Sequence, residues 1–184
     1  MPEQHTFESF AGELHLLVDK FSKGITEFQG SHYNEAKLRD DFLNPLFESL
    51  GWDLRNKAGL IQSKREVEIE SPTRIGSGKK RADYLFRVDG RDRFVCEAKK
   101  PSTPLDKGPV FQAKRYAWNK DLPLVVLTNF EEIKFYIVGA RPDSEEPSQG
   151  EYKILHYIHS LWNRPASFGM CWVVIPYKAA ALTV

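Results

Sequence analysis

The sequence contains little cysteine and no long hydrophobic run. Only Cys96 and Cys171 occur among the 184 residues, so the chain has neither a disulfide framework nor the cysteine spacing of a zinc site. There is no N-terminal signal pattern and no apolar segment of membrane-spanning length, so we expect a cytoplasmic protein that does not engage a membrane. No glycine loop that could cradle a phosphate precedes a helix, which argues against a nucleotide-processing enzyme.

The chain also has almost no excess charge, because its formal net charge is only +1. That value neither favours nor excludes a nucleic-acid partner. Positive charge is instead concentrated between residues 74 and 100, which hold nine basic and four acidic residues. The basic ones are Arg74, Lys79, Lys80, Arg81, Arg87, Arg91, Arg93, Lys99 and Lys100, and the acidic ones are Asp83, Asp89, Asp92 and Glu97. Such a local excess suits a phosphate backbone, although a solvated charged hairpin gives the same pattern.

Three segments have the periodicity of helices. Residues 6–28 and 32–50 carry apolar residues at three- and four-residue spacing, and residues 107–119 form a third candidate. The residues expected to be buried are Phe7, Phe10, Leu14, Leu17 and Phe21 in the first helix, and Leu38, Phe42, Leu46 and Leu50 in the second. Ser31 is the expected N-cap of the second helix, and Pro45 should kink or break it.

Most of the remaining regular segments have the patterns of strands. Residues 66–70 alternate acidic and apolar side chains, and the acids are expected to be solvated. Further strands are expected at 82–88, 93–99, 122–128 and 133–138, a flexible basic loop at 73–80, and a short helix near 152–162. Because helix 107–119 crosses between two strands, one strand pair should be parallel in an otherwise antiparallel sheet. The expected fold is therefore α/β, with a mixed β-sheet flanked by helices.

The strongest candidates for chemistry are Asp83, Glu97 and Lys99, on two strands joined by a turn. Side chains two apart in a strand share a face, and the other arm of the hairpin can bring Asp83 beside that face. Two carboxylates and an ammonium at one point suit a hard divalent cation and a water. The tripeptide Glu-Ala-Lys also occurs at residues 35–37, in a helical stretch where residues two apart diverge by roughly 200°. The alternative at 97–99 is an ordinary cross-strand ion pair.

Glu35 is unusual for its place in the second expected helix. It falls within the apolar stripe of that helix, where a carboxylate is rare unless it is paired or binds a metal. Arg39 lies one turn later, so a salt bridge between the two residues at the helix edge is the other interpretation. The sequence leaves both open.

With these residues, the chain resembles the PD-(D/E)XK nuclease superfamily. Within it, the chain resembles the N-terminal endonuclease domain of type I restriction enzyme R subunits and of type IIG restriction-modification enzymes. The resemblance covers residues 30–140, and its motifs are Arg81-Ala82-Asp83-Tyr84, Glu97-Ala98-Lys99-Lys100-Pro101-Ser102, Gln112-Ala113-Lys114-Arg115-Tyr116 and Leu127-Thr128-Asn129-Phe130. Ala82 stands where the superfamily name has proline. Relatives continue into a translocating ATPase or a methyltransferase, whereas this sequence has neither a P-loop nor a methyltransferase motif.

The resemblance implies a restriction-endonuclease-like three-layer core and a Mg²⁺-dependent endonuclease that hydrolyses DNA phosphodiester bonds, with Mn²⁺ as a substitute. Asp83, Glu97 and Lys99 would be catalytic, and the metal ligands would be Asp83, Glu97, the carbonyl of Ala98 and Glu35. The residues expected at DNA are Lys79, Lys80, Arg81, Lys100, Gln112, Arg115 and Tyr116. Gln112 and Tyr116 resemble the Gln-x-x-x-Tyr motif of type I nuclease domains, which would steady DNA or the lysine.

One nuclease domain is expected over residues 1–164, with residues 1–30 as its N-terminal helix. Residues 165–184 contain a single charged side chain, Lys178, and form either a final strand or a tail from truncation or a reading-frame change. The expected partners are double-stranded DNA, methyltransferase, specificity or translocase modules on this or other chains, and a second copy of the chain as a homodimer. The alternative function is a DNA-binding, nuclease-like module that does not cut on its own.

Overall fold

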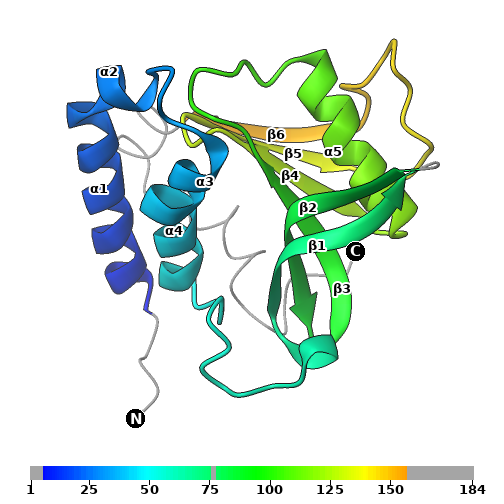
Figure 1. Cartoon of the computed structure of the whole chain (residues 1–184), viewed down its shortest axis with the longest axis horizontal. Coiled ribbons are helices and arrows are strands. Elements are labelled where there is room, and N and C mark those ends of the chain that lie inside the picture. Colours follow the sequence, from blue (N-terminus) through cyan, green and yellow to red (C-terminus); the bar gives the residue numbers. More distant parts are fainter. Residues whose placement is uncertain (1–5, 76–77, 157–184) are drawn as a thin grey trace.

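The computed structural model of the chain describes residues 6–75 and 78–156 (Figure 1). Its helical segments are α1 (Phe7–Lys23), α2 (Ile25–Phe28), α3 (Glu35–Leu38), the π-helical η1 (Arg39–Leu43), α4 (Asn44–Ser49), the 3-10 helix η2 (Gln62–Lys64) and α5 (Lys107–Asn119). Its strands are β1 (Val67–Ile75), β2 (Gly78–Val88), β3 (Arg91–Ala98), β4 (Leu124–Thr128), β5 (Glu132–Ile137) and β6 (Glu151–His156). Within these ranges, no helix has both the length and the apolar character needed to cross a membrane.

The strands form one six-stranded sheet in the order β1-β2-β3-β4-β5-β6. β3 and β4 are parallel, and the other neighbouring pairs are antiparallel. Helix α5 connects β3 to β4, which confirms the expected crossover. Helices α1 to α4 lie on one side of the sheet and α5 lies on the other (Figure 1). The expected α/β fold, a mixed sheet between helical layers, is therefore confirmed.

The sheet separates two apolar cores, and neighbouring strand residues point into different ones. Phe86 belongs to the core shared with the N-terminal helices, whereas Leu85 belongs to the core shared with α5. On β3, Phe94 and Cys96 face the N-terminal helices and Val95 faces α5. The central strands are thus buried on both faces, as strands between two helical layers must be. Cys96 is a buried free thiol, as the alternation predicts.

The first expected helix forms, with two corrections. Thr6 caps α1 through reciprocal hydrogen bonds with Ser9, and the helix ends before Gly24, so the expected helix 6–28 is in fact α1 followed by α2. Four of the predicted core residues are buried, namely Phe10, Leu14, Leu17 and Phe21. Phe7 is 51% exposed because it opens the helix, at the end remote from the aromatic cluster that surrounds Phe21.

Pro45 breaks the second helix in the expected manner. Since proline has no N–H, it cannot donate to the carbonyl of Asp41, four residues earlier. The preceding turn takes a π-helical register in which the N–H of Asn44 donates to the carbonyl of Arg39. The carbonyl of Asp41 instead accepts a hydrogen bond from Nζ of Lys20, at 3.3 Å. Leu38, Phe42, Leu46 and Leu50 are all buried, as the periodicity predicts.

Two expectations near these elements are wrong. Asn34, and not Ser31, caps the second helix, because its side chain accepts a hydrogen bond from the N–H of Lys37. Residues 73–75 and 78–80 are strand and not part of a loop, since the β1–β2 ladder continues to the pair formed by Ile75 and Gly78. Backbone pairing along a long ribbon outweighs the loop character of a Gly- and Lys-rich sequence.

The expected helix near 152–162 is also wrong where the structure describes it. Residues Glu151–His156 form β6, which pairs antiparallel with β5. The open edge of β5 offers backbone partners to this short segment, and its helical pattern is too weak to compete. Residues 157–184, including the segment 165–184 with its unusual composition, lie outside the described residues.

Candidate active site

β2 and β3 form the predicted hairpin and then part at Asp83. Asp89 and Gly90 make the two-residue turn, with φ values of 52° and 71° that suit an Asp-Gly hairpin. The pairing of β2 with β3 extends to Tyr84, which lies opposite Cys96. Past Tyr84, β2 stays paired with β1. Figure 1 shows the β1–β2 ribbon bending across the sheet toward α5. Asp83 is therefore the first residue of β2 past the fork between the two strands.

The fork brings the predicted acid, acid and amine to one place. Oδ2 of Asp83 accepts a hydrogen bond from the backbone N–H of Ala98 at 2.8 Å. In a continuous ladder, this N–H would donate to a neighbouring strand instead. Nζ of Lys99 lies 2.8 Å from Oε1 of Glu97. The structure thus gathers the three side chains, while their catalytic and metal-binding roles remain predictions.

Glu97 is the most perturbed acid of this cluster. It is only 4% exposed, and its Oε1 accepts hydrogen bonds from Lys99 and from Nε2 of Gln112, each at 2.8 Å. Its Oε2 is buried and has no hydrogen-bond partner within the described residues. Burial, followed by the negative charge of Asp83, raises the pKa of Glu97 to about 7, although Lys99 opposes the shift. Glu97 therefore presents one unused acceptor oxygen in a poorly hydrated place.

Lys99 lies between carboxylates from two elements. Its Nζ is 2.8 Å from Glu97 and 3.8 Å from Oε1 of Glu35, which projects from α3. Burial alone lowers the pKa of Lys99, but attraction to Glu97 and then to Glu35 outweighs burial, and the pKa is raised. Lys99 is therefore a charged ammonium at neutral pH, and Glu35 lies beside the site.

Arg39 also belongs to the site, a role that the sequence did not reveal. The described residues show no bridge between Glu35 and Arg39. Instead, Arg39 places one guanidinium nitrogen 2.6 Å from Oδ1 of Asp83 and the other 3.3 Å from Oε1 of Glu70. Burial lowers the pKa of Arg39, but Asp83 and Glu70 outweigh it and raise the pKa overall.

Glu70 is the second residue that sequence reasoning missed. Glu70 is exposed, as expected for the acids of 66–70, but it also pairs with Arg39 and, at 3.0 Å, with Arg81. Its backbone has a φ of 55°, in a region that non-glycine residues seldom occupy and that often marks functional sites. Glu70 lies opposite Asp83 in the β1–β2 ribbon. Nothing in the alternating pattern signals such a conformation, whereas the one-turn spacing from Glu35 could have drawn attention to Arg39.

Helix α5 supports the acid cluster from the other layer. Gln112 bridges Glu97 to Tyr116, whose side chain is hydrogen-bonded to Gln112. Tyr116 is 2% exposed, and burial, then the charge of Glu97, raises its pKa. A side chain this deeply buried offers DNA little surface, so the structure favours Tyr116 as a support for Gln112, and its expected DNA contact stays a prediction. Arg115 lies over the ring of Phe111, 5.5 Å from its centroid.

A cavity of about 490 Å³ opens at this cluster. It is lined by Asn34, Glu35, Ala36, Arg39, Glu70, Asp83, Lys100 and Thr103. The lining includes three carboxylates and two cations, from α3, both arms of the ribbon and the segment after β3. Glu97 and Lys99 are not in the lining, since they are more deeply buried.

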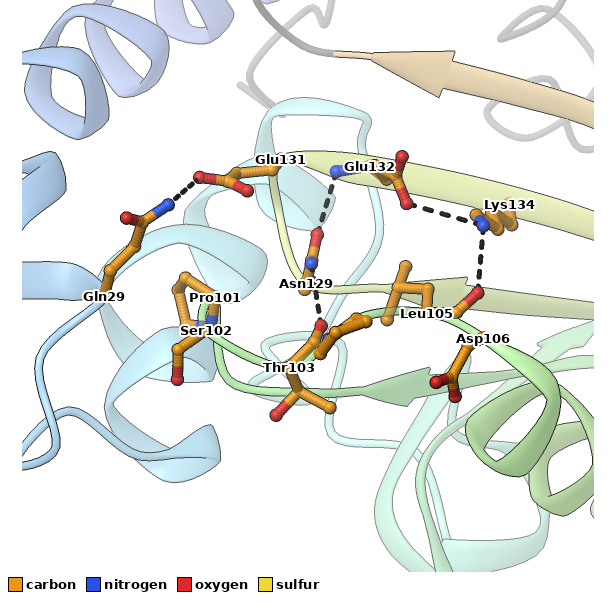
Figure 2. A pocket seen from close by; sticks show the side chains of 11 residues that line it. Gln29, Pro101, Ser102, Thr103, Leu105, Asp106, Asn129, Glu131, Glu132 and Lys134 are labelled. Atoms are coloured by element: carbon orange, nitrogen blue, oxygen red, sulfur yellow. Dashed lines mark hydrogen bonds and ion pairs between the residues drawn. The ribbon is translucent and has the colours of Figure 1, made fainter.

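A second cavity, of about 620 Å³, lies between the segment after β3 and the turn from β4 to β5 (Figure 2). Thr103 lines both cavities. The second cavity contains Asp106, Glu131 and Glu132, whereas its Lys134 is already 2.9 Å from the carbonyl of Leu105 and 3.5 Å from Glu132. The first cavity also has three carboxylates but has two cations, so it offers a phosphate backbone more positive charge than the second cavity does.

The basic excess around the site is smaller than the sequence indicates. Arg87 forms ion pairs with Glu68 and Asp92, and Arg81 forms one with Glu70. Arg81 nevertheless remains 67% exposed, and Lys100 lines the first cavity. Lys79 and Lys80 lie on β2, but their side chains are outside the described residues.

The donor set fits a hard divalent cation in its chemistry. Carboxylate and carbonyl oxygens are the preferred ligands of Mg²⁺, and Oε2 of Glu97 is a buried acceptor with no hydrogen-bond partner among the described residues. Among the described residues, however, no three His, Cys, Asp or Glu side chains are close enough to enclose a metal. Both oxygens of Asp83 are already bonded, to Arg39 and to Ala98. Side-chain movement at Asp83 would therefore accompany metal binding.

Comparison with known proteins agrees with this arrangement. The sequence profile described as type I restriction enzyme R protein N terminus (HSDR_N) matches residues 34–149, which contain every residue of the cluster. The chain is also 35% identical, over 150 residues, to the type II restriction enzyme and methyltransferase RM.Eco57I of Escherichia coli. That alignment covers 79% of this chain but only 15% of the relative, so the chain spans a small part of the longer enzyme. No solved structure gave a significant match.

Proposed function

Because the chain belongs to the family of type I restriction enzyme R protein N termini, we propose that it is a restriction-modification nuclease that hydrolyses DNA phosphodiester bonds with Mg²⁺. The observation that carries this proposal is the meeting of Asp83, Glu97 and Lys99 at the fork between β2 and β3. Two acids and an amine beside a cavity with cationic residues supply the groups that metal-assisted phosphate hydrolysis requires.

In the proposed reaction, Asp83, Glu97 and the carbonyl of Ala98 would hold the cation, and Glu35 would complete its shell directly or through water. When bound, Mg²⁺ would polarise a phosphoryl oxygen and lower the pKa of a water molecule, and Mn²⁺ would serve in its place. Lys99 orients the attacking water or stabilises the negative charge that develops on the phosphate. The water oxygen bonds to phosphorus as one phosphorus–oxygen bond to the sugar breaks. The water gives up one proton and the departing sugar oxygen takes up one, which leaves a phosphate monoester and a hydroxyl.

Two residues of α5 have a supporting role in this proposal. Gln112 fixes Oε1 of Glu97, and Tyr116 fixes Gln112. The acid is thereby held in one orientation while its other oxygen is available to the cation. Lys100 and Arg81 are the described cations placed to bind the DNA backbone.

The test is cleavage of supercoiled plasmid DNA in Mg²⁺, Mn²⁺ and EDTA. We expect nicking in both metals and none in EDTA, and we expect Asp83→Ala to abolish it. Asp19→Ala is the matched control, because Asp19 is also paired with a cation, Lys23 at 2.7 Å, but lies on α1. Equal nicking by the Asp83→Ala protein and its parent would falsify the assignment.

A DNA-binding module that does not cut alone is the second candidate. It is favoured by one observation, the engagement of both Asp83 oxygens by other groups. In this case DNA binding weakens with salt and no metal supports cleavage. We also propose methyltransferase modules as partners, on this chain or on others, since the relative is by its name a restriction enzyme and methyltransferase.

A further inference from the structure

We propose that Arg39 is an internal counter-ion which occupies Asp83 until a divalent cation displaces it, and that Glu70 retains the displaced guanidinium. This inference rests on the proposed metal-dependent function. It assigns Arg39 and Glu70 as positioning residues that set the affinity of the site for its cation.

The contacts of Arg39 are divided between two acids. One nitrogen is 2.6 Å from Asp83 and the other is 3.3 Å from Glu70. The Arg39 and Asp83 side chains are 17% and 15% exposed, so water competes little for their bond. Glu70 is 49% exposed and more weakly engaged. Release from Asp83 therefore breaks one contact and leaves the guanidinium attached at the other.

Charge gives the reason for an exchange. Arg39 contacts Glu70 and Asp83, and Lys99 contacts Glu35 and Glu97, so two cations link the four acids, while Arg81 contacts Glu70 as a third cation. A divalent cation at Asp83 would replace the charge that Arg39 contributes and would repel the guanidinium. Oδ2 of Asp83 can keep its bond to Ala98, because a carboxylate has about four acceptor positions, so Oδ1 is the atom to be freed.

The backbone of β1 supports the same interpretation. The left-handed conformation of Glu70 turns its carboxylate toward Arg39 and Arg81, although an extended strand residue would cost less. Glu70 already contacts Arg39, at 3.3 Å, so it is the acid that can retain the guanidinium. Both Arg39 and Glu70 line the cavity in which the exchange would take place.

The test is titration of the whole chain with Mn²⁺ in the absence of DNA, by calorimetry. We expect Arg39→Met to bind Mn²⁺ about tenfold more tightly than the parent, since the competing charge is gone. Structural damage alone would weaken binding. Arg39→Gln is a second variant that keeps a hydrogen-bond donor for Asp83 and should also bind more tightly. Arg55→Met is the control, because Arg55 pairs with Glu48 at 2.8 Å and is 73% exposed.

A double-mutant comparison separates exchange from simple charge removal. Glu70→Gln should weaken Mn²⁺ binding severalfold in the parent but much less in the Arg39→Met background, where no guanidinium needs to be retained. Arg39→Met should also lower the melting temperature in EDTA and recover it in Mn²⁺. Unchanged Mn²⁺ affinity in both Arg39 variants, or an equal effect of Glu70→Gln in both backgrounds, would overturn the exchange.

The same titration distinguishes this inference from the proposed function. A parent that binds Mn²⁺ and loses binding in Asp83→Ala supports the metal site, whatever Arg39 does. If the parent protein, like the Asp83→Ala variant, binds no Mn²⁺, both the metal site and the exchange are refuted.

Discussion

The chain contains the tripeptide Glu-Ala-Lys twice, at 35–37 and 97–99, and the two copies behave in opposite ways. In α3 the side chains of Glu35 and Lys37 diverge, and Nζ of Lys37 binds the carbonyl of His32 at 3.1 Å. In β3 and the residue after it, the acid and the amine meet at 2.8 Å. Identical residues thus give an exposed lysine in one place and a buried ion pair in the other, because a helix separates positions that a strand aligns.

Burial widens the difference between the two copies. Ala36 is exposed, whereas Ala98 is fully buried between Glu97 and Lys99. Glu35 meets solvent with 46% of its side chain, and Glu97 with 5%. Water satisfies the hydrogen-bonding capacity of an exposed carboxylate, whereas a buried carboxylate must find other partners or shift its pKa. Position in the fold, and not composition, therefore decides that Lys99 is buried within the cluster while Lys37 is exposed.

The largest expected effect comes from the two lysines. Lys99→Ala should reduce plasmid cleavage by about 10²- to 10³-fold, as the loss of a group that stabilises developing negative charge does. The Lys37→Ala variant should cleave plasmid DNA as fast as the parent does. The rate of nicking in Mg²⁺ measures the activity of each variant, and the comparison fails if the two variants lose activity equally.

Glu97 should make the stability of the protein depend on pH. The native pKa of Glu97 is about 7, above the ordinary glutamate value of 4.5, so between these pH values the native state holds a proton that the unfolded chain has lost. Stability therefore falls as pH rises through this interval, by up to about 3 kcal/mol from this group.

Urea unfolding in EDTA at pH 4.5 and pH 7.5 measures this slope. Glu97→Gln should remove that part of the decline, because an amide does not titrate. A Glu97→Gln protein whose stability follows the parent at both pH values would show that Glu97 titrates normally.

The two alanines test packing inside the same tripeptide. Ala98→Val should destabilise the protein by about 1–3 kcal/mol, because no space remains around a fully buried alanine. Ala36→Val should cost about 0.5 kcal/mol, from helix propensity alone. Denaturant midpoints measure both, and equal losses would mean that the site around Ala98 can relax.

The smallest expected effect concerns the support from α5. Tyr116→Phe should slow cleavage by about tenfold without changing DNA affinity, since it loosens Gln112 and not a DNA contact. Tyr152→Phe, at a tyrosine that is 68% exposed, is the control. A loss of DNA affinity in Tyr116→Phe would instead favour the original expectation of a DNA contact.

Local patterns predicted the elements that carry the central cluster. The helix expected at 107–119 forms as α5 with the same bounds, and the hairpin around Asp89-Gly90 forms as β2 and β3. Both signals are local, since apolar periodicity and turn chemistry act within a few residues. The helix expected near 152–162 failed because a distant neighbour, the edge of β5, decides the state of residues 151–156.

The amino-acid sequence by itself determined the reactive groups and the strand alternation that aligns Glu97 with Lys99. It also determined the break before Pro45, because the missing N–H is a property of that residue. The tertiary structure alone decided that β2 and β3 part at Asp83, that Arg39 binds this acid, and that Glu70 turns toward both. The contacts of Arg39 join segments more than thirty residues apart, and Glu70 has a positive φ that the alternating pattern does not signal, so a local pattern encodes neither outcome.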